Sequence, residues 1–252
     1  MVYFVGAGSG AKDLMTVRGA KLLSQADVII YAGSLVNPAL LEYAKPDAQI
    51  HNSAKMTLEL VIQGMKQAEE KGLMTVRLHT GDSSIYGAVR EQFDALDQAG
   101  IPYEVCPGVS SFCAAAAALN AEYTLPGLSQ TVIISRMAGR TPVPDKENLA
   151  SLASHQASMV LFLSAGLLEE TQRELLKGGY LPDTPAAIVY KASWPDEQLH
   201  HCTVATLAQT AREQGISNLA LILVGSFLGD GYSRSKLYDP AFSTGFRMAS
   251  EP

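Results

Sequence analysis

The chain has 252 residues, of which 47% are hydrophobic and 17% charged, the balance of a globular protein with a sizeable core. Its formal net charge of −6 argues against broad binding to nucleic acid or to an acidic membrane, because both require a basic face. No run of about 18 uncharged apolar residues is present, so a membrane-spanning helix is not expected. The first residues lack a basic leader and are expected to form a strand rather than a signal peptide. These features predict a cytoplasmic protein.

The cysteines and histidines do not form a metal-binding pattern. Cys106, Cys113 and Cys202 are odd in number and lack the paired spacing of a zinc site or a disulfide framework. His200 and His201 are adjacent, so on a strand their rings would point to opposite faces. We therefore expect free thiols in a reducing compartment and no metal bound by the protein.

Short apolar runs alternate with helical periodicity through the first half of the chain. The pattern predicts strands at residues 2–5, 28–31, 75–78 and 103–105. It predicts helices at residues 14–23, 57–71, 84–98 and 110–119. This alternation is typical of a mainly parallel sheet covered by helices.

An irregular stretch at 120–130, containing Pro126-Gly127, interrupts this alternation and predicts a boundary between domains at 1–122 and 123–252. Strands are then expected at 131–135, 159–163, 186–190, 198–204 and 219–224, with helices at 166–177 and 205–213. Because some of these strands follow one another without a helix, the second sheet is expected to be mixed. The tail after Gly229 is expected to be irregular. The predicted fold is two α/β domains with a cleft between them.

The first strand runs into a glycine-rich turn, Gly6-Ala7-Gly8-Ser9-Gly10-Ala11. This order satisfies the dinucleotide-binding fingerprint, in which glycines let backbone amides approach a pyrophosphate. That mechanism also needs an acid at the end of the second strand, but Asp27 stands at the beginning of that strand. A tight turn without ligand contact therefore remains an alternative.

Two further turns follow buried strands and lead towards helices. The first contains Thr80-Gly81-Asp82-Ser83, and the second contains Cys106-Pro107-Gly108-Val109-Ser110-Ser111. Turns at the carboxyl ends of parallel strands are where α/β folds hold ligands. Helix capping by the acid and the hydroxyls is the alternative. Three such turns at one edge favour a binding site.

Arg136 and Arg140 lie four residues apart in a loop after the expected boundary. Arginine is suited to bidentate recognition of carboxylates, although a solvated surface loop is the alternative. No Ser-His-Asp set, paired-carboxylate motif or phosphate-binding loop is visible, which excludes the usual hydrolase and kinase signatures.

Together these motifs resemble the tetrapyrrole (corrin/porphyrin) methylase family over nearly the whole chain. The resemblance rests on residues 5–10 with the helix at 14–23, on residues 80–87 and on residues 107–111. Within the family, residues 31–36, 136–144 and 237–240 resemble the branch that methylates C11 of precorrin-4 or cobalt-precorrin-4 on the route to vitamin B12.

The resemblance implies S-adenosylmethionine bound between two α/β domains, and a homodimer. The implied cofactor contacts are Thr80, Gly81, Asp82, Ile85, Ser110, Ser111, Leu163, Ala192 and Ala220. Given an anionic macrocycle as substrate, Arg136 and Arg140 are expected to pair with its carboxylates. No catalytic base is assigned, and any cobalt would belong to the substrate.

Several alternatives stay open at this stage. One alternative is methylation of another ring carbon of a precorrin or uroporphyrinogen. The sequence also does not distinguish a cobalt-loaded from a metal-free substrate. An NAD(P)-dependent oxidoreductase would use the first turn, and a non-catalytic binding protein would use the same scaffold without chemistry.

Overall fold

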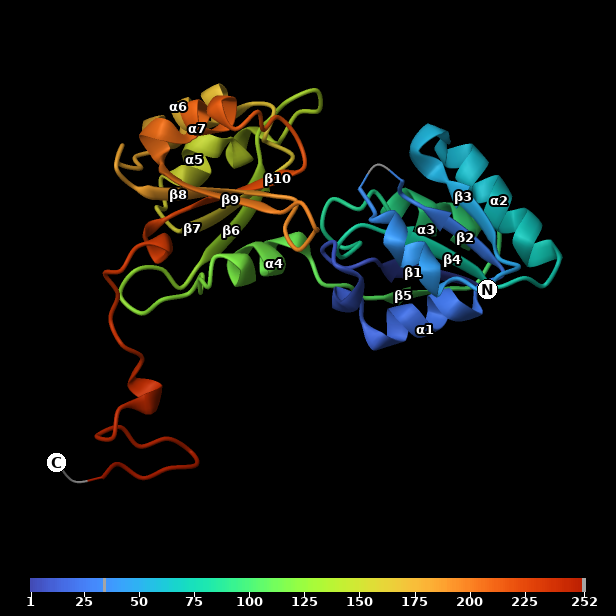
Figure 1. The fold of residues 1–252 in the computed structure, drawn as a ribbon, viewed down its shortest axis with the longest axis horizontal. Helices are drawn as coiled ribbons and strands as arrows, with labels where there is room; N and C mark the ends of the chain where they lie inside the picture. The colour runs from blue at the N-terminus through green and yellow to red at the C-terminus, as the bar shows by residue number, and fades with distance from the viewer. Residues whose placement is uncertain (34, 251–252) are drawn as a thin grey trace. The chain divides into compact units, whose positions relative to one another are not determined.

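The computed structural model describes residues 1–33 and 35–250 (Figure 1). The chain forms two compact units, each built on a five-stranded sheet. The first unit contains residues 1–115 and 191–197, and the second contains residues 116–190 and the described residues from 198 onward. The expected division into domains at residues 1–122 and 123–252 stays a prediction.

The first sheet is parallel throughout and has the strand order β3-β2-β4-β1-β5. Its strands are β1 (Val2–Gly6), β2 (Val28–Tyr31), β3 (Gln49–Asn52), β4 (Thr75–His79) and β5 (Tyr103–Cys106). The predicted parallel sheet is therefore confirmed. Because all five strands run the same way, the turns that follow β1, β4 and β5 lie at one edge of the sheet.

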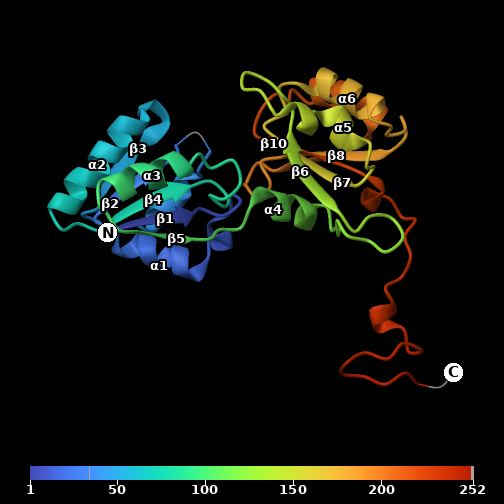
Figure 2. The ribbon, with the colours of Figure 1, turned by 180° about the vertical axis from the view of Figure 1, so that it is seen from behind.

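Helices cover both faces of the first sheet. Helix α1 (Val17–Gln25) lies on one face, and α2 (Leu58–Glu70) and α3 (Arg90–Gln98) lie on the other (Figures 1 and 2). Val5 packs in the core under α1, and its neighbour Phe4 packs in the core under α2 and α3. This burial on both faces explains the nearly continuous apolar runs of the strands.

The helix expected at residues 84–98 is shorter than predicted. It begins at Arg90, because Tyr86 and Ala88 have positive φ angles of 54° and 48° that end any helical path through them. Gly87 between them lies so close to Ser83 that a Cβ would stand 2.1 Å from the Ser83 carbonyl oxygen. Residues 83–89 therefore form a compact turn.

The second sheet has the order β6-β7-β10-β8-β9. Its strands are β6 (Val132–Arg136), β7 (Ser158–Phe162), β8 (Pro185–Tyr190), β9 (Gln198–Thr203) and β10 (Ala220–Val224). Only the β6–β7 pair is parallel, and the other three pairs are antiparallel. The predicted mixed sheet is confirmed.

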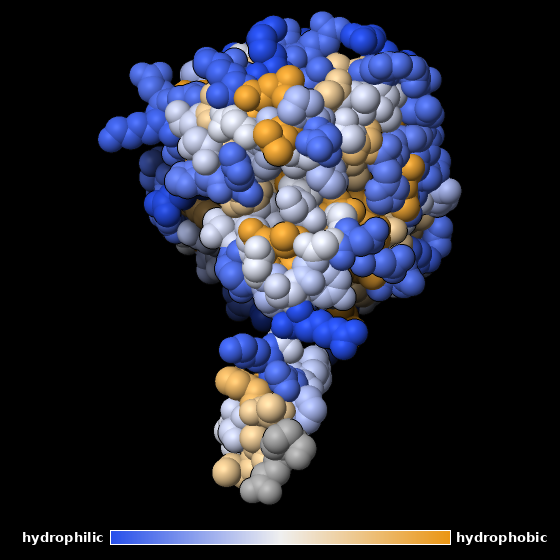
Figure 3. Space-filling view, turned by 90° about the vertical axis from the view of Figure 1, so that its left-hand side faces the viewer, coloured by the Kyte–Doolittle hydropathy of each residue, from blue (hydrophilic) through white to orange (hydrophobic). Residues whose placement is uncertain are grey.

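The helices after β5 are α4 (Ser111–Ala118), α5 (Leu149–Ala153), α6 (Leu168–Lys177) and α7 (Leu207–Glu213). The apolar sides of α5, α6 and α7 share one core with the second sheet. Hydrophilic residues gather at the top of Figure 3, where α6 and α7 lie. This division between a buried and a solvated side is what amphipathic helices require.

One strand and one α-helix were absent from the predicted pattern. Strand β3 is polar and exposed, so its sequence has no apolar alternation, and α5 is only five residues long. Within the described residues 230–250, the tail contains only the short 3₁₀ helix Lys236–Tyr238, in agreement with the expectation. None of the helices within residues 1–33 and 35–250 combines the length and apolar character needed to cross a membrane.

Candidate functional site

The three glycine-bearing turns meet at the carboxyl edge of the first sheet. Gly8 and Gly81 exchange backbone hydrogen bonds of 3.2 and 3.0 Å, and the Ala7 N–H donates to the His79 carbonyl at 2.6 Å. A Cβ on Gly6 would stand 2.6 Å from both the Gly108 Cα and the Gly81 carbonyl oxygen. Glycine is therefore required where these backbones approach one another.

Asp82 joins the second turn to the third. Its Oδ2 accepts a hydrogen bond of 2.7 Å from the Gly108 N–H, and its Oδ1 accepts bonds from the Ser84 N–H and hydroxyl. Partial burial acts to raise the pKa of Asp82, but the hydrogen bonds from Ser84 and Gly108 outweigh it, so this pKa lies below its ordinary value. The carboxylate is thus ionised and serves as the anchor between the two turns.

The third turn brings two predicted cofactor residues to the second turn. A Cβ on Gly81 would stand 3.5 Å from the Ser110 Cα and 3.6 Å from the Ser111 N. Ser110 is buried and Ser111 begins α4. Six of the predicted cofactor residues are therefore neighbours in the first unit: Thr80, Gly81, Asp82, Ile85, Ser110 and Ser111.

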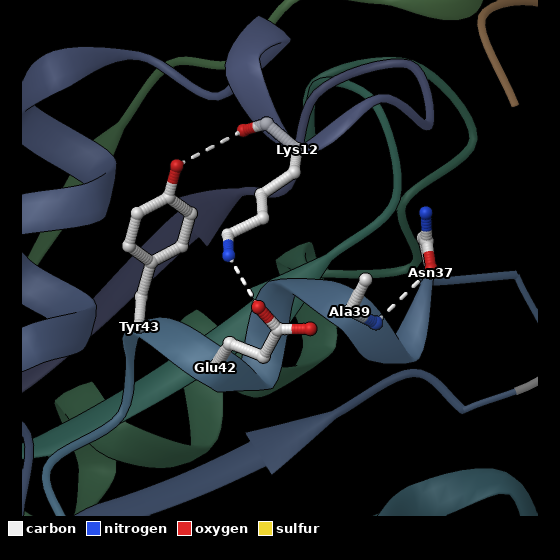
Figure 4. A network of polar contacts seen from close by, with 5 residues as sticks. All are labelled: Lys12, Asn37, Ala39, Glu42 and Tyr43. Carbon is white, nitrogen blue, oxygen red and sulfur yellow. Dashed lines mark hydrogen bonds and ion pairs between the residues drawn. The ribbon is translucent and has the colours of Figure 1, made fainter.

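Residues 37–43 hold the first turn and the residues after it (Figure 4). The Asn37 side-chain amide donates to the Gly10 carbonyl at 2.9 Å, and the Tyr43 hydroxyl donates to the Lys12 carbonyl at 3.4 Å. The Lys12 ammonium forms an ion pair with Glu42 and lies 5.1 Å from the centre of the Tyr43 ring. Ser34, in the branch-specific segment 31–36, lies outside the described residues.

Residues 191–197, here called the strap, connect β8 to β9 but belong to the first unit. The Ser193 hydroxyl lies 2.9 Å from the Ser9 hydroxyl and accepts a bond of 3.0 Å from the Ala11 N–H. The Trp194 indole covers Gly10, where a Cβ would stand 2.0 Å from its Cδ1. The strap therefore brings the predicted cofactor residue Ala192 into the unit that holds the three turns.

The remaining predicted residues lie at one edge of the second sheet. Arg136 ends β6, and Leu163 follows the end of β7. Ala220 begins β10, the strand that pairs with β7. Leu163 is unusual for an apolar residue, because 64% of its surface is exposed.

The two arginines of the 136–140 loop have different surroundings. The Arg136 guanidinium donates to the carbonyl oxygens of Met137, Thr141 and Pro142, at 3.1, 3.1 and 2.6 Å. Arg136 thereby closes its own loop, whereas Arg140 is exposed near the tip of that loop. Buried Ser164 fixes the loop's base, because its hydroxyl accepts from the Met137 N–H at 2.9 Å.

Strained backbone concentrates at the predicted site. Eight non-glycine residues have positive φ within the described part of the chain, and six of them lie at or within three residues of a predicted cofactor residue. These six are Tyr86, Ala88, Leu163, Lys191, Ser193 and Leu219. Such conformations cost about 1–3 kcal/mol each and cluster at functional sites. Positive φ angles therefore occur beside predicted cofactor residues in both units.

Sequence patterns did not reveal several residues that shape the site. Arg77, His79 and Gln92 are buried polar residues beneath the second turn. Arg77 and His79 lie in a predicted strand and Gln92 in a predicted helix, and neither pattern marked them as site residues. Ser193 and Trp194 of the strap were also missed, although a lone tryptophan after a strand was a usable signal. Residues 1–33 and 35–250 contain no group of three or more His, Cys, Asp or Glu side chains able to hold a metal.

These features define an α/β protein whose candidate site lies at backbone turns that follow the carboxyl ends of parallel strands. Residues 1–208 match the family model of the tetrapyrrole (corrin/porphyrin) methylases. The chain belongs to this family.

Relatives in the family cover nearly the whole chain. A cobalt-precorrin-4 C(11)-methyltransferase of Methanocaldococcus jannaschii is 51% identical over 98% of this chain and 96% of its own length. The Priestia megaterium protein of the same name is 47% identical, over 98% of this chain and 97% of its own.

Solved structures of methyltransferases share the fold of this chain. A cobalt precorrin-4 methyltransferase has a TM-score of 0.89 and 46% identity, over 91% of this chain and 96% of that chain. A uroporphyrin-III C-methyltransferase of Thermus thermophilus, solved with S-adenosylhomocysteine, has a TM-score of 0.74 and 26% identity. That match covers 90% of this chain and 98% of that chain.

Proposed function

We propose that this chain transfers the methyl group of S-adenosylmethionine to C11 of cobalt-precorrin-4 or precorrin-4, in the biosynthesis of cobalamin. The observation that carries the proposal is the identity of 51% to a cobalt-precorrin-4 C(11)-methyltransferase over 98% of the chain. Identity to relatives named uroporphyrin-III or uroporphyrinogen-III C-methyltransferase is lower, at 26% to 32%. This difference favours C11 over another ring carbon.

The residues at the turns fit S-adenosylmethionine. Gly108 lets the third turn approach the backbone of Gly6 and Gly81, and the hydroxyls of Thr80, Ser110 and Ser111 supply neutral hydrogen-bonding groups at these turns. We propose that these turns bind the cofactor together with Ile85 and the strap residue Ala192. Leu163 and Ala220, which lie in the second unit, are proposed as further cofactor contacts.

The sulfonium of the bound cofactor supplies an activated methyl group and its own leaving group. A bond forms between C11 and the methyl carbon, the sulfur–methyl bond breaks with its electron pair left on sulfur, and charge balance releases one proton from the tetrapyrrole. The chain's contribution is to hold the two reactants in line, which can be worth about 7–11 kcal/mol.

Substrate recognition is proposed for the 136–140 loop. Arg140 is exposed and able to form bidentate hydrogen bonds with a carboxylate of the macrocycle. Arg136 already donates to three carbonyl oxygens of its own loop. We therefore propose that Arg136 supports substrate binding partly by holding the loop that positions Arg140. Both relatives above are named for the cobalt-loaded substrate, which favours that form.

The oxidoreductase alternative has less support. Strand β2 ends at Tyr31 and continues into Ala32 and Gly33, without the acid that would bind a ribose. Asp27 lies at the other end of β2, where its carboxylate accepts hydrogen bonds from the Met74 N–H and Lys45. A titration with NAD(P)H is expected to show no binding.

The quaternary state and the location are also proposals. We propose a cytoplasmic homodimer, and sedimentation of the purified protein at micromolar concentration tests the dimer. A single species with twice the chain mass of 26.9 kDa supports it, and a monomer contradicts it.

Activity is tested by incubating the protein with S-adenosylmethionine and, separately, cobalt-precorrin-4, precorrin-4 and uroporphyrinogen III. Mass spectrometry should show the gain of one methyl group on a precorrin-4 form, larger for the cobalt-loaded one, and none on uroporphyrinogen III. Methylation of uroporphyrinogen III alone would contradict the proposed substrate.

A further inference from the structure

Arg77 is a buried cation beneath the compact turn at residues 83–89, here called the cofactor turn, and the proposed function assigns it no role. It lies in β4 and is 6% exposed. Burial lowers the pKa of Arg77 to about 10, which still leaves the guanidinium charged at neutral pH. Within the described part of the chain no ion pair includes Arg77. A buried charge of this kind must be held by hydrogen bonds to neutral groups.

Two neutral acceptors hold the guanidinium. The Arg77 Nε donates to the side-chain oxygen of Gln92 at 3.1 Å, and its Nη1 donates to the Ile30 carbonyl at 3.1 Å. Gln92 is 5% exposed and lies in the first turn of α3. Because an arginine can only donate, the Gln92 Oε1 must face it and the Gln92 Nε2 must point the other way.

The other end of the Gln92 amide holds the turn above. Its Nε2 donates to the Ala88 carbonyl at 2.9 Å. Ala88 has a φ of 48° and Tyr86 a φ of 54°, which are conformations that an alanine and a tyrosine rarely adopt. A strained backbone persists only when its surroundings fix it. Gln92 supplies such a contact from the core of the first unit.

We propose that Gln92 is a positioning residue for the cofactor turn. Arg77 orients the Gln92 amide, and the amide fixes the Ala88 carbonyl, so that residues 83–89 are held in the conformation that presents Ile85 to the cofactor. This inference rests on the proposed function, because Ile85 is a proposed cofactor contact.

The substitution Gln92→Glu separates this role from stability. A glutamate at this position still accepts from Arg77, with a favourable charge, but it has no N–H to donate to the Ala88 carbonyl. We expect amide hydrogen exchange of residues 85–89 to become about tenfold faster, since one hydrogen bond is lost. The melting temperature should not fall. Gln98→Glu, which adds the same charge at an exposed position of α3, should leave this exchange unchanged.

A second substitution provides rescue. Glycine adopts a positive φ without strain, so Ala88→Gly should lower the need for the contact with Gln92. The double variant Gln92→Glu with Ala88→Gly should regain part of the affinity for S-adenosylhomocysteine, measured by calorimetry, that Gln92→Glu alone loses. If Gln92→Glu does not fold, Gln92→Met removes both hydrogen bonds and gives the same exchange test.

Unchanged exchange of residues 85–89 in a folded Gln92 variant would overturn the proposal, and so would unchanged affinity for S-adenosylhomocysteine. Absence of binding in the unsubstituted protein would instead contradict the proposed function. The exchange measurement needs no ligand, so in that case it still decides whether Gln92 holds the turn.

Discussion

The Asp82 carboxylate accepts a hydrogen bond of 2.7 Å from the Gly108 backbone N–H, which joins the turn after β4 to the turn after β5. The same carboxylate accepts from Ser84 through its other oxygen. Both oxygens are therefore bound to groups of the protein itself. Asp82 acts on the site by fixing the two turns that the cofactor is proposed to contact.

Replacing Asp82 with asparagine tests this role. Asparagine keeps one oxygen for Ser84, but its NH₂ group cannot accept the bond from Gly108. A hydrogen bond to a charged group contributes about 1.5–3 kcal/mol, so affinity for S-adenosylhomocysteine should fall by about tenfold or more. Calorimetry measures the change, with exposed Asp183→Asn as the control. Equal affinities would leave Asp82 as a local turn residue only.

Because Gly6, Gly81 and Gly108 lie so close together, alanine at Gly6 should destabilise the protein, whereas alanine at a glycine in open space should not. Gly6→Ala places a Cβ 2.6 Å from Gly108 and from Gly81, so it should displace the turns and lower both the melting temperature and the cofactor affinity. Gly64→Ala in α2 meets only the Ile30 side chain, at 3.6 Å. It should stabilise the protein by up to about 1 kcal/mol. Chemical denaturation of both variants checks the contrast, which fails if Gly6→Ala is neutral.

The strap predicts a fluorescence signal. Trp194 is the sole tryptophan of the chain, and it covers Gly10 in the first turn. Binding of S-adenosylhomocysteine should therefore change the intrinsic fluorescence. Ser193→Ala loses the acceptor for the Ala11 N–H and should weaken binding by about fivefold to tenfold. Ser154→Ala, at an exposed helix end, is the matched control. A fluorescence titration that is identical for both variants would exclude the strap from cofactor binding.

The arginine loop predicts an effect on substrate without an effect on cofactor. Arg140→Ala should raise the KM for cobalt-precorrin-4 about tenfold or more, because a bidentate pair with a carboxylate is lost, and should leave the KM for S-adenosylmethionine unchanged. Arg173→Ala in α6 serves as a control with the same loss of charge. If Arg140→Ala leaves the substrate KM unchanged, its role in recognition is wrong.

His79 predicts a dependence of stability on pH. Burial, and then the charge of Arg77, lower the pKa of His79 to about 3 from the 6.5 expected for the unfolded chain. The unfolded state therefore binds more protons between these values, and stability should rise with pH until about 6.5 and then level off. From pH 5 to pH 7 this contribution is about 2 kcal/mol.

The matched substitution is His79→Leu, which removes the titrating group beside Phe4 and the unpartnered buried Nε2. Urea unfolding at pH 5 and pH 7 should show a smaller pH effect in this variant by about the same 2 kcal/mol. An equal pH effect in both proteins would show that folding does not lower the pKa of His79.

Most of the fold could be predicted from the sequence. Strands β1, β2 and β4 are buried on both faces, so they appear as apolar runs between helices. The predicted ranges of these strands and of β5 differ from the structure by a residue or two. Strand β3 could not be predicted because it lies at the edge and is exposed. The prediction of helix at residues 84–89 was wrong, because helical periodicity in the sequence does not reveal the positive φ angles of Tyr86 and Ala88.

The site was predictable in part, because glycine turns after strands have a recognisable order. Thr80, Gly81, Asp82, Ser110 and Ser111 follow strands β4 and β5, and the structure brings them together. What the sequence could not provide is the side-chain network below them. The hydrogen bonds of Gln92 join β4, α3 and the turn between them, and such a three-way contact depends on tertiary packing rather than on local pattern.

The most direct test of the central claim is the position of the transferred methyl group. Cobalt-precorrin-4 would be incubated with the protein and with S-adenosylmethionine carrying ¹³C in its methyl group, and the label would then be located by NMR. The account predicts one labelled methyl, bonded to C11. A label on any other ring carbon, or no transfer to either precorrin-4 form by a protein that binds S-adenosylhomocysteine, would contradict it.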